Sequence, residues 1–340
     1  MSYLPIRMSR VTIKELARYL QVNPSTISRA LRDHPDVSQR LKEQVHELAD
    51  KLGYKPNFTA INLRKGKSGL IGLIIPEISP YFFPSVIKAI EEEVATQGYQ
   101  LLILHSNDSL EREIHHAEIC ARLGTEGVLV SLTRESGDLE HFQELMYAGT
   151  PVVFFDKILY DSISHRVSIP GELAAAEAVR HLLAKRSSNG YVLALMGDER
   201  LSITQDRLRG IHQVLQEEAL SVCYSPDANH AKEAFCEAMD RSTRPAAIFL
   251  MSDEVMEGVL RGCHERNWLQ QELPPMVVMS DGFLPKVADL RIDYVHTSGY
   301  QLGRSAVNLL FKLIGGEKVS ESQIHWIAPA LMMADAQQPY

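Results

Sequence analysis

The sequence predicts a small all-helical head, joined by a linker to a larger α/β domain with two lobes. Residues 10–66 contain short amphipathic segments with helix-starting residues, whereas short apolar runs alternate with helical patterns from Ser68 onward. The sign of the net charge also changes at this boundary, near residue 66. Residues 1–66 hold 12 Lys and Arg against 6 Asp and Glu, a net charge of +6, so the remainder carries −14 within a chain of net charge −8. A basic head on an acidic body is typical of a nucleic-acid-binding module attached to a domain that does not itself bind nucleic acid.

Composition narrows the class of protein. The 340 residues are 45% hydrophobic and 23% charged, as in globular domains. No apolar run reaches the length of a membrane span, and the N-terminus lacks the pattern of a secretory signal. The four cysteines show no C-x-x-C spacing, which is expected of reduced thiols. We therefore expect a cytoplasmic protein that contacts no membrane.

The head begins with two closely spaced helices. Thr12 and Glu15 form a capping box, which starts a helix. Apolar residues then recur on one face, at Ile13, Leu16, Ala17 and Leu20. Asn23 is a good N-cap for a second helix, with Pro24 at its first position. So short a connection is typical of the helix-turn-helix of DNA-binding proteins, whose second helix enters the major groove.

The second helix divides into an apolar and a polar face. Ile27, Ala30 and Leu31 face inward, which leaves hydroxyls and guanidinium groups outside. Taken alone, this polar face fits an ordinary solvated surface equally well. A third helix follows, capped by Ser38 and ended by Gly53, with one apolar stripe at Leu41, Val45, Leu48 and Leu52.

The motifs V-x-x-S-T-I-S-R, beginning at Val22, and G-Y-x-P-N…A-x-x-L, beginning at Gly53, resemble the LacI/GalR family of bacterial transcription regulators. The resemblance covers nearly the whole chain. It implies that the linker is a hinge helix that lies in the DNA minor groove and inserts Leu63 between base steps, with Asn57 and Ala60 beside it. Without the resemblance, Leu63 would be read as a core leucine that anchors the linker.

The resemblance also implies a domain plan and a set of DNA contacts. The expected domains are the helix-turn-helix at 10–56, the hinge at 57–67, and a periplasmic-binding-protein-like (type I) effector-binding and dimerisation domain at 68–335. We expect its N-lobe to comprise about 68–160 and 297–320, and its C-lobe about 161–296 and 321–335. The expected DNA-contacting residues are Thr12, Pro24, Ser25, Thr26, Ser28, Arg29, Arg32, Asn57, Thr59, Ala60 and Leu63.

The α/β domain is predicted from alternating patterns. Apolar runs of strand length occur at 70–76, 100–105, 127–131, 151–155, 191–196, 246–251 and 275–279. Helical patterns lie near 84–97, 110–123, 139–148, 172–186, 205–218, 230–240, 254–267 and 300–314. Such buried runs separated by helices indicate parallel sheets covered on both faces, here in two series with a break near 157–171.

Open parallel sheets bind ligands beyond the carboxyl ends of their strands. Aspartates, hydroxyls, aromatic residues and one arginine follow the predicted strands, and together they suit a small polar ligand such as a sugar or a sugar acid. One by one, they read equally well as helix caps and solvated residues. The resemblance implies effector contacts at Ser79, Tyr81, Phe82, Asp156, Arg207, Ser252 and Asp281. Ser252 and the segment 279–282 depart from the family pattern, so the resemblance does not specify the effector.

Patterns for catalysis and metal binding are missing from the sequence. His115 and His116 are adjacent, so they face different sides of a helix, and no H-E-x-x-H, G-x-S-x-G or Walker A motif occurs. We expect no catalytic residue, metal or cofactor. The sequence thus indicates a homodimeric transcription regulator, expected to be a repressor, that binds a near-palindromic double-stranded operator under control of a carbohydrate-like effector. The alternative is a cytoplasmic α/β sugar-binding protein or enzyme with an unrelated helical head.

Overall fold

The computed structural model describes residues 11–54, 67–160, 164–186, 190–269, 273–320 and 324–334. The chain divides into two compact units, Met1–Lys67 and Ser68–Tyr340. Each unit has its own apolar core. The two units are therefore described separately, and we call the described part of the first unit, residues 11–54, the head.

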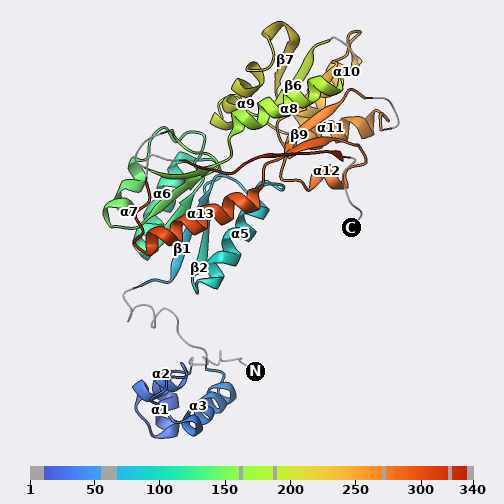
Figure 1. The fold of residues 1–340 in the computed structure, drawn as a ribbon. Coiled ribbons are helices and arrows are strands. Elements are labelled where there is room, and N and C mark those ends of the chain that lie inside the picture. The colour runs from blue at the N-terminus through green and yellow to red at the C-terminus, as the bar shows by residue number, and fades with distance from the viewer. Residues whose placement is uncertain are drawn as a thin grey trace, which may run out of the picture. The chain divides into compact units, whose positions relative to one another are not determined.

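The head consists of three helices, α1 (Ile13–Leu20), α2 (Pro24–Ala30) and α3 (Gln39–Lys51) (Figure 1). The Thr12 amide donates to Glu15 Oε2 at 2.6 Å, and the Glu15 amide donates to Thr12 Oγ1 at 3.3 Å, which confirms the capping box. Leu16, Ile27 and Val45, one from each helix, are completely buried and form the centre of the core. The helix-turn-helix arrangement therefore follows from the apolar face that each helix presents.

The second unit contains two six-stranded sheets. The first has the strand order β11-β5-β4-β3-β1-β2, and all its pairings are parallel. Its strands are β1 (Leu70–Ile75), β2 (Gln100–His105), β3 (Gly127–Val130), β4 (Val152–Phe155), β5 (His165–Ser168) and β11 (Ile324–Trp326). This sheet and its helices form the first lobe.

The second sheet has the order β12-β10-β9-β8-β6-β7, and only β12 runs antiparallel to its neighbour. Its strands are β6 (Val192–Met196), β7 (Leu220–Tyr224), β8 (Ala247–Leu250), β9 (Met276–Ser280), β10 (Asp293–His296) and β12 (Ala330–Met332). This sheet and its helices form the second lobe. The expected two-lobed α/β architecture is therefore confirmed.

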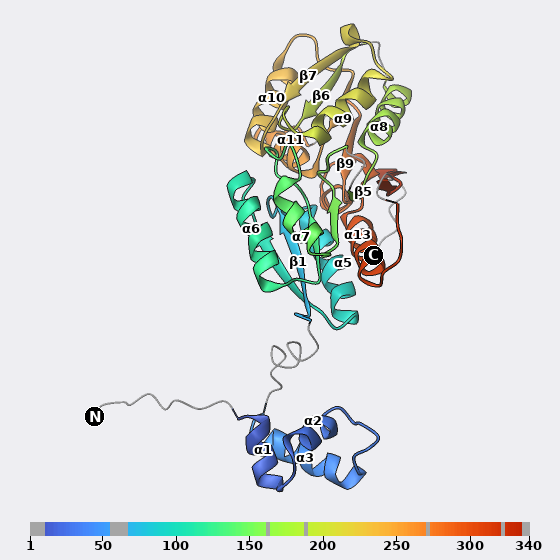
Figure 2. The same cartoon turned by 90° about the vertical axis from the view of Figure 1, so that its left-hand side faces the viewer.

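Helices cover both faces of each sheet. In the first lobe α5 (Phe83–Thr96) and α13 (Gly299–Ile314) pack on one face, whereas α6 (Leu110–Leu123), the short η1 (Glu140–Phe142) and α7 (Gln143–Tyr147) pack on the other. Figure 2 shows α6 to one side of β1 and α5 and α13 to the other. Alternate residues of each strand enter the two cores, which is why the strands read as continuous apolar runs.

The second lobe is built in the same way. Its first face carries α8 (Gly171–Lys185) and α9 (Ser202–His212), and its second carries α10 (Ala228–Asp240) and α11 (Asp253–Glu265). Two short elements, η2 (Glu217–Ala219) and α12 (Leu284–Val287), complete it. The chain passes between the lobes three times: between β5 and α8, between β10 and α13, and between β11 and β12.

The expected lobe boundaries are wrong at two strands. β5 and β11 fall in the ranges assigned to the C-lobe, yet β5 pairs with β4 and β11 pairs with β5 in the first sheet. The reason is that β5 reads His-Arg-Val-Ser and forms no apolar run, so its place depends on pairing with β4 rather than on its own pattern. The first crossing therefore follows Ser168 instead of preceding it.

Candidate functional site

The head presents a polar face on α2. Ser25, Arg29 and Arg32 are exposed, and Thr26 and Ser28 are partly exposed. Within the described residues neither Arg29 nor Arg32 has a carboxylate partner, so both guanidinium groups are available to another molecule. Pro24 occupies the first position of α2, and the Asn23 side chain makes no capping bond. This face can therefore supply hydroxyl and guanidinium donors to an anionic surface.

The other expected DNA contacts have different positions. The Thr12 hydroxyl is exposed but donates to Glu15 Oε2 at 3.0 Å, so the capping box already uses it. Asn57, Thr59, Ala60 and Leu63 lie outside the described residues. The proposed minor-groove part of the interface therefore stays a prediction.

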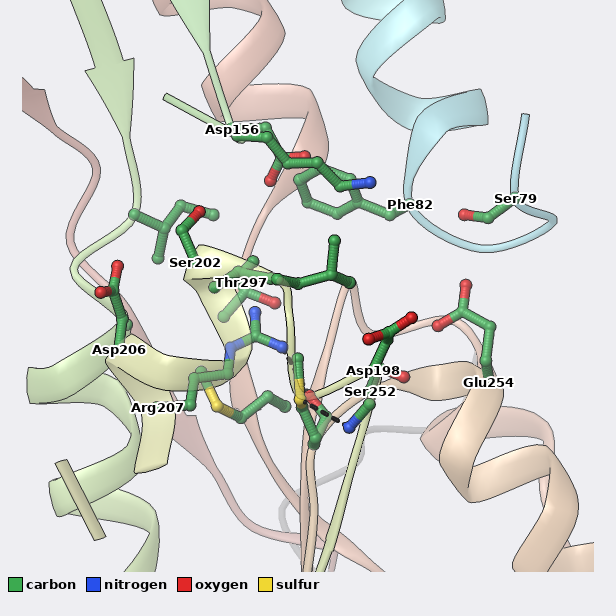
Figure 3. Close-up of a pocket in the computed structure, with 18 of the residues that line it drawn as sticks. Ser79, Phe82, Asp156, Asp198, Ser202, Asp206, Arg207, Ser252, Glu254 and Thr297 are labelled. Carbon is green, nitrogen blue, oxygen red and sulfur yellow. Dashed lines mark hydrogen bonds between the residues drawn. The ribbon is translucent and has the colours of Figure 1, made fainter. Parts of the chain in front are cut away.

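In the second unit, a cavity of about 260 Å³ lies between the lobes. It lies beyond the carboxyl ends of strands from both sheets, where parallel sheets bind ligands. The expected effector contacts that line it are Ser79, Phe82, Asp156, Arg207, Ser252 and Asp281. Figure 3 shows Asp156 and Phe82 on one side of the cavity and Arg207 on the other. The structure thus brings together side chains from five distant parts of the sequence.

Tyr81 is the exception, because it does not line this cavity. Its hydroxyl instead donates to Glu257 Oε2 on α11 at 2.8 Å, and so joins the first lobe to the second. Burial and the neighbouring Glu257 carboxylate raise the pKa of Tyr81. In this arrangement Tyr81 contacts the opposite lobe rather than a ligand in the cavity.

Arg207 is held in the cavity wall by close packing of two helices. A Cβ atom at Gly210 would lie 2.1 Å from the Glu172 carbonyl oxygen, so glycine there lets α9 approach α8. The Arg207 side chain is only 8% exposed, and its Nη1 donates to the Met251 carbonyl at 2.6 Å. Burial lowers the pKa of Arg207 to about 10, although Asp156 across the cavity opposes this effect. The guanidinium is therefore charged at neutral pH and only partly hydrogen-bonded.

Asp156 follows β4 in the left-handed backbone region, with φ of +60°. Ser131 Oγ donates to its Oδ2 at 3.4 Å, and the Ser168 hydroxyl donates to its carbonyl oxygen at 3.3 Å. Burial raises the pKa of Asp156, while the nearby Lys157 and Arg207 charges lower it. Asp156 thus offers a carboxylate acceptor opposite the Arg207 donors.

A buried hydrogen-bond network forms the floor between β8 and β9. Ser280 Oγ donates to Asp253 Oδ1 at 2.5 Å, and the Asp281 amide donates to Asp253 Oδ2 at 3.1 Å. Burial raises the pKa of Asp253 to about 6 despite these bonds. Asp281 Oδ1 in turn accepts the Gly299 amide at 2.7 Å, where α13 begins in the first lobe. Asp281 therefore lines the cavity while it already binds the opposite lobe.

The sequence did not indicate several polar groups that meet across the cleft. Arg134 Nη1 of the first lobe donates to Asp198 Oδ2 of the second at 2.8 Å. The Tyr160 hydroxyl donates to Asp206 Oδ2 at 2.7 Å. Arg134 and Tyr160 lie several residues beyond their strands, in segments without regular spacing, so only the folded chain shows that they face the other lobe. These bonds join the two lobes beside the cavity.

The described ranges contain no group of three or more His, Cys, Asp and Glu side chains placed to hold a metal ion. Every helix in those ranges is too short or too polar to cross a membrane.

Comparisons with known proteins agree with this division of the chain. Residues 12–57 match the model of the bacterial regulatory proteins of the lacI family. Residues 68–330, more than half of the chain, match the model of periplasmic binding proteins and the sugar-binding domain of the LacI family. Each of the two matched ranges lies within one of the two units of the structure and covers most of that unit.

Individual relatives cover nearly the whole chain. Catabolite control protein A from Priestia megaterium is 26% identical over 320 residues, which is 92% of this chain and 95% of that protein. The sucrose operon repressor from Klebsiella pneumoniae is 28% identical over 325 residues, with 92% and 95% covered. A crystal structure of the Lac repressor dimer bound to operator and an anti-inducer has a TM-score of 0.79 at 18% identity, covering 95% of this chain and 98% of that one. The last comparison shows a shared fold.

Proposed function

The chain belongs to the LacI family of bacterial regulatory proteins, and from this premise we propose that it is a sequence-specific DNA-binding repressor of carbohydrate genes. In this proposal the head binds an operator and the cavity binds a small polar effector. The observation that carries the proposal is the presence, in one chain, of a donor-rich face on α2 and a cavity between two lobes. An enzyme is disfavoured, because this family consists of regulators.

The proposed DNA contact rests on charge and exposure. Arg29 and Arg32 are exposed cations without carboxylate partners in the described head, and they follow Ser25 and Ser28 along the chain. Phosphate contacts from such cations position a protein on DNA, whereas donors at the N-terminal end of the second helix specify bases. We infer that α2 is the recognition helix.

The proposed control rests on the position of the cavity between the lobes. A ligand that contacts Asp156 in the first lobe and Arg207 in the second favours the lobe arrangement in which both contacts are made. Because the head precedes the first strand of the first lobe, a change in lobe arrangement is able to alter how two heads are presented to DNA. The mechanism is a two-state coupling between the DNA site and the effector site.

We further propose that the protein acts as a homodimer in the cytoplasm. Helix-turn-helix proteins bind two half-sites of a near-palindromic operator as symmetric dimers. The structurally similar Lac repressor is a dimer on its operator. A cytoplasmic location follows from the need to reach chromosomal DNA.

The proposed DNA binding is tested by fluorescence anisotropy with a DNA fragment from upstream of the chain's own gene. We expect log K to fall with log salt concentration by about 0.9 for each phosphate contacted. Arg29→Ala should weaken binding about tenfold or more, because a guanidinium contact to phosphate or base is lost. Arg180→Ala, which removes an exposed arginine of α8, is the matched control and should leave the affinity unchanged. Binding that is equal on upstream and random DNA, and insensitive to Arg29→Ala, would contradict the proposal.

A further inference from the structure

The cavity between the lobes has an excess of negative charge. Eight carboxylate side chains line it, against the basic side chains of Arg134, Lys157 and Arg207. Three of the carboxylates have basic partners: Asp198 pairs with Arg134 and Arg200, Asp206 with Arg209, and Asp227 with His230. Of the three basic side chains that line the cavity, only Arg134 takes part in these pairs, and Lys157 and Arg207 do not.

Five carboxylates therefore face two cations. The carboxylates belong to Glu77, Asp156, Asp253, Glu254 and Asp281, and the cations to Lys157 and Arg207. Arg207 already faces the Asp156 carboxylate across the cavity, whose charge opposes the lowering of the Arg207 pKa by burial. An anionic ligand would enter against this excess of negative charge, whereas a cationic ligand would reduce it.

Two buried donors show that the cavity is built for a polar ligand. Arg207 Nε is completely enclosed and has no hydrogen-bond partner in the described structure. The Ser225 hydroxyl, whose residue is 2% exposed, is likewise enclosed and unpartnered there. Figure 3 shows the Arg207 guanidinium directed into the cavity. Buried donors without acceptors are costly, so a ligand oxygen that accepts from either one is strongly favoured.

Glu254 supplies a carboxylate at a second point of the same cavity. It is the second residue of α11, and Figure 3 shows its side chain extending toward the loop that carries Ser79. No hydrogen bond or ion pair joins its carboxylate to any described residue, although the cavity is partly enclosed. A protonated amine placed there would gain a charge-assisted hydrogen bond that a neutral hydroxyl does not provide.

We propose that the effector is a polyhydroxylated molecule with a protonated amine, of the amino-sugar class, whose hydroxyl groups accept from Arg207 and Ser225 and whose ammonium group binds Glu254. This inference rests on the proposed effector site and specifies its ligand chemistry. The same charges select against sugar phosphates and sugar acids.

The test is calorimetry on the full chain at pH 7 with the gluco, galacto and manno series, each as the 2-amino-2-deoxy sugar, the parent sugar and the 6-phosphate. In the series that binds best, the amino sugar should bind about tenfold more tightly than the parent sugar, and the 6-phosphate should bind least. Glu254→Gln should bring the affinity for the amino sugar to within about threefold of that for the parent sugar in the same variant. Glu265→Gln, at the other end of α11 and outside the cavity, is the control and should preserve the preference.

Three results overturn the inference: a 6-phosphate that binds as tightly as its amino sugar, an amino-sugar preference that survives Glu254→Gln, or no binding by any of the amino sugars. None of these results affects operator binding, which is measured separately by anisotropy. If a neutral or anionic sugar releases the operator, the proposed function stands and only the ligand class is wrong. If the chain shows no preference for its upstream DNA, the proposed function fails. The calorimetric preference for amino sugars is then judged separately, because it does not depend on DNA binding.

Discussion

At the scale of single residues, the cleft buries ionisable side chains, and the loss of hydration around their charged forms destabilises the folded state. Asp253 is 5% exposed, and burial raises its pKa from 3.8 to about 6. The unfolded chain releases this proton near pH 4, whereas the folded chain retains it to about pH 6. Between these values the folded state binds more protons, so stability falls as the pH rises. Above pH 6 the buried Asp253 carboxylate is ionised, which lowers the unfolding free energy by about 3 kcal/mol.

Asp253→Asn removes this dependence. Relative to wild type, the variant should gain about 2 kcal/mol in unfolding free energy between pH 4 and pH 7, whatever its constant offset from altered hydrogen bonds to Ser280. Urea unfolding at both pH values measures the difference. Asp227→Asn is the control, because hydrogen bonds from His230 lower the pKa of Asp227. The stability difference between this variant and wild type arises mainly below pH 4, so it should show no comparable gain between pH 4 and pH 7. A pH-independent difference for Asp253→Asn would show that Asp253 is ionised without cost.

The sequence predicted the cleft residues that follow directly on strands, because the carboxyl ends of parallel strands meet at one edge. Asp156 and Ser252 are examples. It did not predict the bonds of Arg134 to Asp198 or of Tyr160 to Asp206, since these depend on how one lobe faces the other. Tyr81 was expected to contact the effector, but it does not line the cavity, and its hydroxyl donates to Glu257 of the other lobe. Local sequence patterns therefore identify the residues at the carboxyl edge of each sheet, whereas the arrangement of the two lobes determines which residue each of them contacts.

Among the elements, one helix start and one helix end agree with their sequence signals, although Ser38 at the start of α3 makes no side-chain capping bond. The capping box of α1 and Gly53 after α3, with φ of +63°, are both where the sequence places them. β5 was missed because its four residues include one buried apolar side chain, Val167, and pairing with β4 supplies the rest. Strands defined by pairing rather than by apolar runs therefore set the limit of sequence-based prediction here.

The hinge element gives a prediction about DNA specificity. If Leu63 inserts between base steps, Leu63→Ser should remove most of the preference for the operator while it spares binding to random DNA, which is largely electrostatic. Competition binding at fixed salt measures both affinities. Ala60, expected beside Leu63, provides a milder comparison as Ala60→Ser. Equal losses on operator and random DNA would instead identify Leu63 as a folding residue.

Across the whole molecule, charge separates the two tasks. The net charge of +6 in residues 1–66 attracts DNA, and the −14 of the remainder keeps the larger unit away from phosphates. The same negative excess continues into the cavity, where it selects the charge of the ligand. The central claim is that occupancy of this cavity changes the affinity of the head for its operator, which requires coupling between the two units.

The most direct test measures operator affinity by anisotropy with and without a saturating sugar, chosen as the one with the largest thermal shift, in wild type and in Arg207→Ala. Wild type should change its operator Kd by about 5-fold to 150-fold, and operator should change the sugar affinity by the same factor. Arg207→Ala should keep the operator affinity of the sugar-free wild type and show no response to the sugar. A sugar that binds wild type with the same affinity in the presence and absence of operator, and leaves the operator Kd unchanged, would contradict the account.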